Sequence, residues 1–246
     1  TFLDCNQIFY QCIFHNSRVP WRADKVYQMM LNAPVNVLNQ IGLRGSLRAV
    51  NEVEANSVRI AGIGGGRVGE AMVVVGNLLL DFDYSLMSRV WKVPDQSFRD
   101  LALETMEERV GTLNILDCNH TLESLQSYLT EAFSESLERP VHEAHLKREE
   151  IQAGKNTAIE LASNEFLSLH RPSGEVKAMK SLKISADVFI HHIHLQLEGR
   201  GEEVSVRVDN GIITDLKTES PRKTNLRKIL IGTLLSEWTR GRIKKE

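Results

Sequence analysis

Residues able to do chemistry concentrate between Asn51 and Gly76, where polar side chains and glycines interrupt two runs of strand-forming residues. Arg59 and Arg67 stand on either side of a glycine cluster. Glycine lets backbone N–H groups approach a phosphate or carboxylate, and arginine adds positive charge, so the segment has the outline of an anion-binding loop. A flexible hairpin turn would use the same residues, and glycine spacing alone does not decide between the two. The glycines are Gly62, Gly64, Gly65, Gly66 and Gly69.

Short motifs follow one another in and after this segment. They are Asn51-Glu52-Val53, Arg59-Ile60-Ala61-Gly62, Val75-Gly76-Asn77, Leu79-Leu80-Asp81-Phe82-Asp83 and Arg109-Val110-Gly111-Thr112-Leu113. Their types and order resemble those of the lipoate-protein ligases, in which the last motif corresponds to an adenylate-binding turn. Residues 1–10 resemble the part that follows the family's glycine-rich lipoate loop, so the resemblance covers nearly the whole chain. The chain is identified by this resemblance as a member of that family, with a biotin/lipoate protein ligase catalytic domain.

The resemblance implies an ATP-dependent ligase that activates lipoate, or a similar acyl acid, as acyl-AMP and transfers it to a lysine of a carrier domain. Arg59 takes the place of the family's lysine and is the expected catalytic residue, while Glu52 is expected to hold Mg²⁺ beside Asn51. Expected partners are lipoyl-accepting carrier domains, of the 2-oxoacid dehydrogenase acyltransferase and glycine cleavage H protein types. The residues expected to bind the nucleotide are Asn51, Glu52, Gly62, Gly64, Gly65, Gly76 and Arg109.

The chain departs from the family pattern in three places. Arg59 replaces a lysine, which exchanges a compact point charge for a planar, permanently charged fork. Glu52 replaces an aspartate. The Arg-Arg-x-x-Gly-Gly-Gly loop that would hold the lipoyl group is not present, and the chain begins at Thr1 without Met, so we interpret it as N-terminally truncated. A second chain that supplies the missing half is the alternative.

Two other functions stay open at this point. An octanoyl or lipoyl transferase would use Cys118, which lies just before an expected helix start, as its nucleophile and would not need ATP. A non-catalytic lipoyl-binding subunit would account for Arg59 and for the missing loop. A further group, His191, His192 and His194, resembles metal ligands, but without a nearby Cys or Asp cluster we interpret it as surface or interface residues and assign no metal.

The elements that would position these residues predict an α+β fold, with a mixed, mostly antiparallel sheet and helices on one face. The family resemblance implies the class II synthetase/biotin ligase-like form of this fold. Alternation of apolar residues predicts strands near 8–14, 47–50, 58–63 and 71–81. Helices are expected over residues 23–41, 84–90, from a Ser97 cap to 108, from a Thr121 cap to 137, and over 157–169.

The chain is predicted to contain two domains, with the break at Arg171-Pro172-Ser173-Gly174. Residues 1–172 would form a partial catalytic domain, and residues 175–246 a small α+β accessory domain. In the second part, strands are expected over 183–197, 203–208 and 213–218, with a tight turn at Asp209-Asn210-Gly211. A helix over 226–238 is expected to cover this three-stranded meander.

The composition fits a soluble, cytoplasmic enzyme. The 246 residues are 42% hydrophobic and carry a formal net charge of −2, so nucleic acid is not an expected partner. The chain has no apolar run of membrane-spanning length, and no membrane association is expected. The cysteines, Cys5, Cys12 and Cys118, are widely spaced without metal-type pairing, which fits a reducing compartment.

Overall fold

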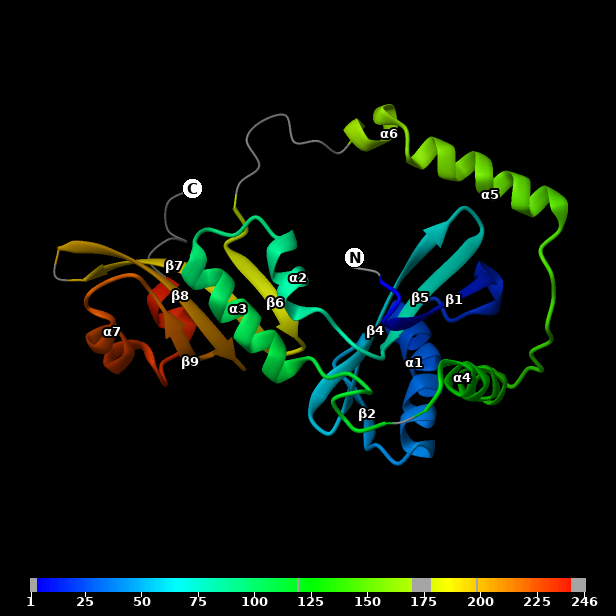
Figure 1. The fold of residues 1–246 in the computed structure, drawn as a ribbon, viewed down its shortest axis with the longest axis horizontal. Coiled ribbons are helices and arrows are strands. Elements are labelled where there is room, and N and C mark those ends of the chain that lie inside the picture. The colour runs from blue at the N-terminus through cyan, green and yellow to red at the C-terminus, as the bar shows by residue number, and fades with distance from the viewer. Residues whose placement is uncertain (1–3, 119, 170–177, 198, 240–246) are drawn as a thin grey trace.

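Two antiparallel sheets organise the chain (Figure 1), in a computed structural model that describes residues 4–118, 120–169, 178–197 and 199–239. The strands are β1 (Gln7–His15), β2 (Gly45–Arg48), β3 (Glu52–Ala55), β4 (Val58–Val68), β5 (Ala71–Leu79), β6 (Ser181–Ser185), β7 (Val188–Leu197), β8 (Arg200–Asp209) and β9 (Ile212–Lys217). The first sheet has the order β1-β5-β4-β3-β2, and the second has the order β6-β7-β8-β9. The predicted α+β class is confirmed.

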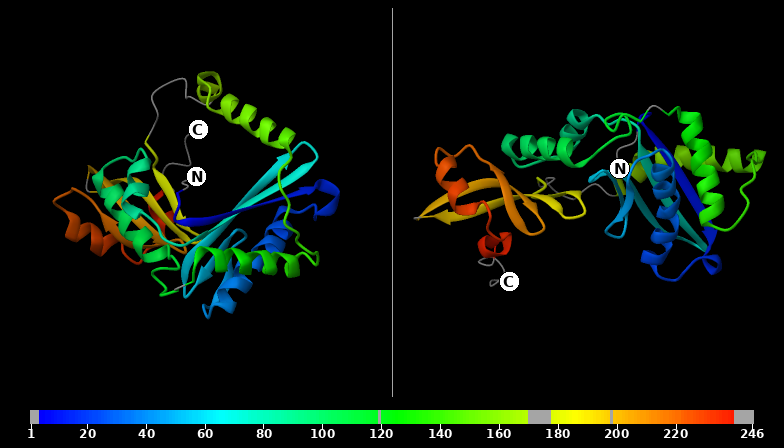
Figure 2. Two further views of the ribbon diagram at one scale, coloured as in Figure 1. Left: turned by 45° about the vertical axis from the view of Figure 1, so that its right-hand side comes forward. Right: turned by 90° about the horizontal axis from the view of Figure 1, so that it is seen from below.

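Helices α1 (Ala23–Gln40) and α4 (Leu122–Ser136) cover one face of the first sheet (Figures 1 and 2). Each presents an apolar stripe to the sheet, so helices and strands share one core and the other face is left uncovered. Thr121 caps α4, as predicted, by accepting a hydrogen bond from the Ser124 backbone N–H. Residues buried in this core include Met30, Leu38, Val53, Ile60, Leu78, Leu125 and Leu129.

The second sheet is packed against helices that precede it and helices that follow it in the sequence. Helices α2 (Tyr84–Val90) and α3 (Gln96–Arg109) precede it in the sequence, and α3 shares a core with β6 and β7 that includes Phe98, Leu101 and Ile190. Helices α7 (Lys223–Leu230) and α8 (Leu235–Thr239) follow it and join a separate core with β8 and β9. Two further helices, α5 (Arg148–Leu161) and α6 (Asn164–Leu169), bury no residue and lie apart from both sheets in Figure 1.

A β-bulge decides which residues of β4 face the helices. The pairing of β3 with β4 shifts register between Val53 and Glu54, so that β4 carries one extra residue, Ile60. Ile60 and the next residue, Ala61, are therefore both buried in the helix-covered core. The residues on either side of this pair, Arg59 and Gly62, consequently share the uncovered face of the sheet.

The glycine-rich segment is a strand, and the loop expected there is wrong. β4 continues to Val68, and the turn lies at Gly69, which has φ of 58°. A glycine run is a poor strand former by itself, but β5 pairs with it throughout and places three valines opposite three of its glycines. The register pairs are Gly62 with Asn77, Gly64 with Val75, Gly65 with Val74, and Gly66 with Val73.

The second sheet has four strands where the sequence predicted three. A turn at residues 186 and 187 separates β6 from β7 inside the stretch predicted as one strand. Even-numbered positions are buried on both sides of this turn, for example Ile184 and Val188, so alternation alone concealed the break. The predicted turn before β9 is confirmed, because Asn210 and Gly211 have φ of 53° and 84°.

Two helices predicted from periodicity are divided in the structure. The segment predicted over 157–169 belongs to α5, which already begins at Arg148, and to α6. The segment predicted over 226–238 is split between α7 and α8, with Gly232 at φ of 86° in the connection. The domain break at 171–174 falls outside the described residues and stays a prediction. Among the helices that can be described, none is both long and apolar enough to cross a bilayer.

Asp95, not the predicted Ser97, caps the N-terminus of α3. Its side chain accepts a hydrogen bond of 2.7 Å from the Phe98 backbone N–H. We expect Asp95→Ala to lower the free energy of unfolding by about 1 kcal/mol. Ser97→Ala, the matched change, should leave it within about 0.5 kcal/mol of the parent protein. Urea denaturation of both variants measures the difference, and equal losses would contradict the assignment of the cap to Asp95.

Candidate functional site

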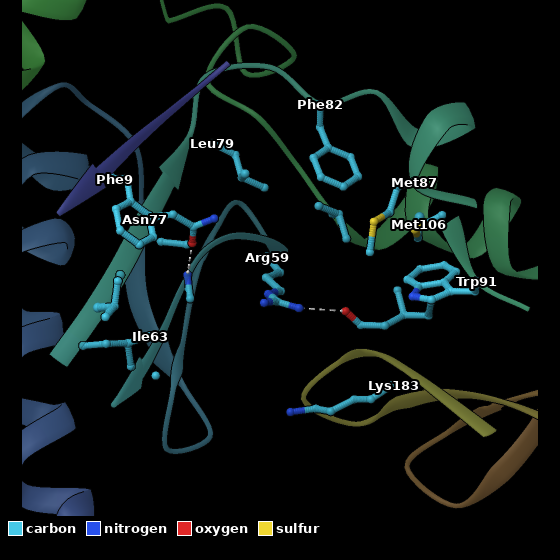
Figure 3. Close-up of a pocket in the computed structure, with 17 residues that line it drawn as sticks. Phe9, Arg59, Ile63, Asn77, Leu79, Phe82, Met87, Trp91, Met106 and Lys183 are labelled. Carbon is cyan, nitrogen blue, oxygen red and sulfur yellow. Dashed lines mark hydrogen bonds between the residues drawn. The ribbon is translucent and has the colours of Figure 1, made fainter. Parts of the chain in front are cut away.

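A cavity of about 670 Å³ lies between the uncovered face of the first sheet and the elements packed on the second sheet (Figure 3). One wall is formed by β4 and β5 and is named the polar wall after the two polar side chains that it carries, Arg59 and Asn77. The opposite wall is apolar and comes from α2, α3 and the segments beside them. A third side is closed by β6, which contributes Lys183 and Ile184. The apolar wall includes Phe82, Met87, Trp91, Met106 and Val110, and Leu79 at the end of β5 adjoins it.

Arg59 projects into the middle of this cavity (Figure 3). The β4 bulge brings its side chain to the uncovered face, where the guanidinium lies against Gly62. A Cβ atom at Gly62 would stand 2.9 Å from Arg59 Nη2, so the close approach of the guanidinium requires glycine there. Arg59 Nη1 donates a 3.1 Å hydrogen bond to the Ile184 carbonyl oxygen. No carboxylate among the described residues pairs with Arg59, and its charge is therefore available to an anionic ligand.

A row of register partners forms the floor beside Arg59. Glu52, Gly62, Asn77 and Phe9 are successive partners across β3, β4, β5 and β1, so their side chains share one face. Asn77 Oδ1 accepts a 3.0 Å hydrogen bond from the Gly62 N–H, and Asn77 Nδ2 donates one of 2.8 Å to Gln7. The Gly62 N–H, predicted as a nucleotide donor, is thus engaged by a side chain in this structure.

Glu52 is a buried carboxylate with one satisfied oxygen. Its side chain is 2% exposed, and Oε1 lies 2.8 Å from Lys183 Nζ. Its second oxygen, Oε2, has no hydrogen-bond partner within the part of the chain that is described. An unpaired buried carboxylate oxygen is costly to maintain, and it is a suitable ligand for a hard cation such as Mg²⁺. Glu52 therefore offers one oxygen of suitable chemistry, and its metal role stays a prediction.

A cation at Glu52 would need ligands from outside the protein. In the described ranges, no three His, Cys, Asp or Glu side chains are arranged to hold a metal ion. Mg²⁺ commonly binds through one or two carboxylates and takes its remaining ligands from phosphates and water. A nucleotide in the cavity would supply those phosphates.

The glycines predicted to bind the nucleotide do not share one environment. Gly64 and Gly76 line the cavity. The space for a side chain at Gly64 is open, whereas at Gly76 it is filled by the ring of Tyr10. Gly65 is pressed against the backbone of β5, since a Cβ there would stand 2.6 Å from the Val73 carbonyl oxygen. The lack of a side chain at Gly65 therefore allows β4 and β5 to pack closely.

Three other residues singled out in the sequence lie elsewhere. Asn51 uses its backbone carbonyl to accept a hydrogen bond from Ile63 N–H. Arg109 is the last residue of α3, and Cys118 packs against the helix-covered core of the first sheet. Within the described residues, Asn51, Arg109 and Cys118 are not part of the cavity wall.

The histidines of β7 are separated by the alternation of the strand. His192 and His194 share one face and both contact Glu203 of β8, at 2.7 Å and 2.9 Å. His191 is on the other face, where its ring stacks on Phe189, and burial lowers the pKa of His191. Glu203 thus bridges the two histidines, and the carboxylate of Asp95, at the start of α3, lies 3.5 Å from His192 Nδ1.

Comparison with known proteins identifies the family. Residues 1–134 match the lipoyl protein ligase A/B catalytic domain. The chain belongs to this family. Its fold resembles a bipartite lipoate protein ligase of Thermoplasma acidophilum, described with its E2 lipoyl domain, with a TM-score of 0.62 and 22% identity over 69% of this chain and 67% of that one.

A second lipoate ligase structure supports the same fold. It is a candidate lipoate protein ligase of T. acidophilum with bound lipoic acid, with a TM-score of 0.52 and 18% identity over 66% of this chain and 65% of that one. This member of the lipoyl ligase family thus spans about two thirds of the length of these solved structures. No curated protein sequence matches it. The family resemblance stated from the sequence motifs is confirmed.

Sequence reasoning missed Lys183 and the apolar wall of the cavity. Lys183 interrupts an alternating apolar strand, and that pattern indicates a side chain on the opposite face from Leu182 and Ile184. Nothing local in the sequence connects this lysine with Glu52, because the two strands belong to different sheets. The apolar wall comes from helix residues that look like ordinary core positions.

Proposed function

We propose that this protein is an ATP-dependent lipoate-protein ligase, which activates lipoate or a similar acyl acid as acyl-AMP and transfers the acyl group to a lysine of a carrier domain. Membership of the lipoyl protein ligase A/B family supports lipoyl chemistry. The observation that carries the proposal is the guanidinium of Arg59, which has no carboxylate partner among the described residues and stands between the polar and apolar walls of one cavity.

The first step is the attack of the acyl carboxylate on the α-phosphorus of ATP. A new phosphorus–oxygen bond forms, and the bond to pyrophosphate breaks. Negative charge spreads over the phosphate oxygens, so a fixed cation beside them stabilises the transition state and holds the two reactants in line. Arg59 is suited to this task because its position is set by Gly62 and by the Ile184 carbonyl. Mg²⁺ held by Glu52 would offset further phosphate charge when bound.

The second step transfers the acyl group. A lysine amine of the carrier attacks the acyl carbonyl carbon, and AMP leaves with the electrons of the broken carbon–oxygen bond. This route needs no nucleophile from the protein, which agrees with the position of Cys118 against the core. The apolar wall, with Phe82, Met87 and Trp91, suits the acyl chain and limits the access of water to the reactive anhydride.

Lipoate-dependent exchange of label between pyrophosphate and ATP tests the proposed function in the full-length gene product. We expect exchange only when lipoate, ATP and Mg²⁺ are all present, and octanoate and biotin in place of lipoate define the acyl substrate. Acyl transfer without exchange, abolished by Cys118→Ala, would favour the cysteine-dependent transferase instead. Transfer to an E2-type lipoyl domain and to an H-protein-type carrier then identifies the acceptor, for which the T. acidophilum ligase described with an E2 lipoyl domain is a precedent.

Gly62→Ala tests the position of Arg59 while leaving Arg59 in place. The new Cβ would stand 2.9 Å from the flexible end of the arginine, which can move aside, so we expect the free energy of unfolding to change by no more than about 0.5 kcal/mol. The exchange rate should fall by about 10²-fold, because misplacing a catalytic group by 1 Å has an effect of this size. Gly66→Ala is the matched control, since a Cβ there meets no atom within 4 Å. Equal rates in the two variants would contradict the role given to Arg59.

A further inference from the structure

We propose that Lys183 is a second cationic binding residue of the cavity, supplied by the second sheet, and that it holds an anionic oxygen of the ligand together with Arg59. The inference rests on the proposed function and adds a residue to its site. The oxygen belongs to the nucleotide phosphate or to the acyl carboxylate, which present the same chemistry to an ammonium group.

The alternation of β6 directs Lys183 into the cavity. Leu182 and Ile184 are buried, whereas the Lys183 side chain lies on the opposite face of the strand and is 40% exposed. Figure 3 shows it extending from β6 towards the first sheet, below Arg59. An ammonium group has three donors, and the ion pair with Glu52 occupies one of them. The described residues give the ammonium no other partner, so its remaining donors can reach a ligand in the cavity.

The charged side chains of the site carry a net positive charge, which favours the binding of an anion. Arg59 and Lys183 are the charged side chains in the described lining of the cavity, and Glu52, which is not part of that lining, is the carboxylate that pairs with Lys183. The site therefore keeps an excess positive charge beside an apolar wall, where electrostatic attraction is weakly screened. If Lys183 and Glu52 were the only charged groups of the site, their charges would cancel and no positive excess would remain.

The strand β6 positions both cations. It carries Lys183 itself, and its Ile184 carbonyl accepts the hydrogen bond from Arg59 Nη1. Glu52 holds the Lys183 ammonium from the first sheet, and a second contact between the sheets, Arg48 with Asp187 at 2.7 Å, lies near the end of β6. The two cations thus keep a fixed separation only while β6 is docked, so the second sheet completes the anion site.

Titration calorimetry with AMP and with octanoate as separate probes tests the proposal on the full-length protein. We expect Lys183→Gln, which keeps a neutral donor for Glu52, to weaken the binding of one probe at least tenfold. Loss of AMP binding assigns the oxygen to the phosphate, and loss of octanoate binding assigns it to the carboxylate. Lys183→Arg retains the charge and should preserve most of the affinity.

Lys180→Gln is the matched control, because Lys180 is exposed and precedes β6 outside the described lining of the cavity. It should bind both probes like the parent protein. The proposal is overturned if Lys183→Gln binds both probes with parental affinity, whatever its thermal stability, or if the parent protein binds neither. Absence of pyrophosphate exchange would refute the proposed function alone, since probe binding is measured without turnover.

Discussion

Arg59→Gln is expected to lower lipoate-dependent ATP–pyrophosphate exchange by about 10²-fold or more, because it removes the positive charge that faces the reacting phosphate. Glutamine is too short to replace the hydrogen bond to the Ile184 carbonyl, but the Lys183–Glu52 and Arg48–Asp187 ion pairs still join the two sheets, so the wall formed by β6 should stay in place. The loss should therefore appear mainly in kcat and leave the urea midpoint close to that of the parent protein. Initial rates at saturating lipoate and ATP measure it.

Arg67→Gln is the matched control for this experiment. Arg67 lies on the same strand, but its guanidinium sits 4.0 Å from the ring centroid of Trp21, away from the main cavity. Arg67→Gln should leave the exchange rate within about twofold of that of the parent protein, because the Arg67 guanidinium touches no reactant. The surface cation–π contact that it removes contributes about 0.5–1 kcal/mol to stability. Equal rates in the two glutamine variants would exclude Arg59 from the reaction.

The variant Arg59→Lys distinguishes a ligase in which Arg59 is catalytic from a subunit in which position 59 no longer takes part in catalysis. A lysine is a compact point charge and cannot contact both the Ile184 carbonyl and a ligand as a planar fork does. If Arg59 is catalytic, the lysine variant should be slower than the parent protein. A large rise in adenylate formation in the lysine variant would instead support the non-catalytic lipoyl-binding subunit.

The class of fold and the strand that carries Arg59 could be predicted because both predictions rest on local sequence patterns. Residues alternate in hydrophobicity around 8–14 and 71–81, and a period of two indicates a strand with one buried face. In the structure these segments are β1 and β5, which bury one face against helices. The order of the family motifs located Arg59, Glu52 and the neighbouring glycines in one region. In the structure these positions lie on neighbouring strands of one sheet.

The rest depended on geometry that no local pattern carries. The bulge at Ile60 turns Arg59 towards the cavity, and a single extra residue in a strand leaves almost no trace in hydrophobic alternation. Lys183 reaches Glu52 only because two sheets dock against each other, which is a tertiary contact between distant segments. The glycines suggested a loop, since their strand conformation is imposed by pairing with β5 rather than by their own propensity.

Gly76 is a strand residue whose missing side chain is replaced by an aromatic ring. Tyr10 of β1 is its register partner, and a Cβ at Gly76 would stand 2.2 Å from Tyr10 Cζ. The other side of the ring is occupied, because Phe133 of α4 meets it edge-on with centroids 5.0 Å apart. Burial also raises the pKa of Tyr10, and its hydroxyl has no hydrogen-bond partner among the described residues. The ring therefore has little room to retreat.

We expect Gly76→Ala to lower the free energy of unfolding by about 1–3 kcal/mol, the usual range for an overpacked core. Gly66→Ala, on the preceding strand, should be neutral or slightly stabilising, because its Cβ would meet open space and alanine restricts the unfolded chain. Urea denaturation measures both. If the clash with the ring is the cause, combining Gly76→Ala with Tyr10→Leu should cost less than the sum of the two single changes. Additive losses would mean that the Tyr10 ring is not what excludes a side chain at position 76. The pairing of β1 with β5, which places Phe9 and Asn77 in the cavity, would then not depend on this contact.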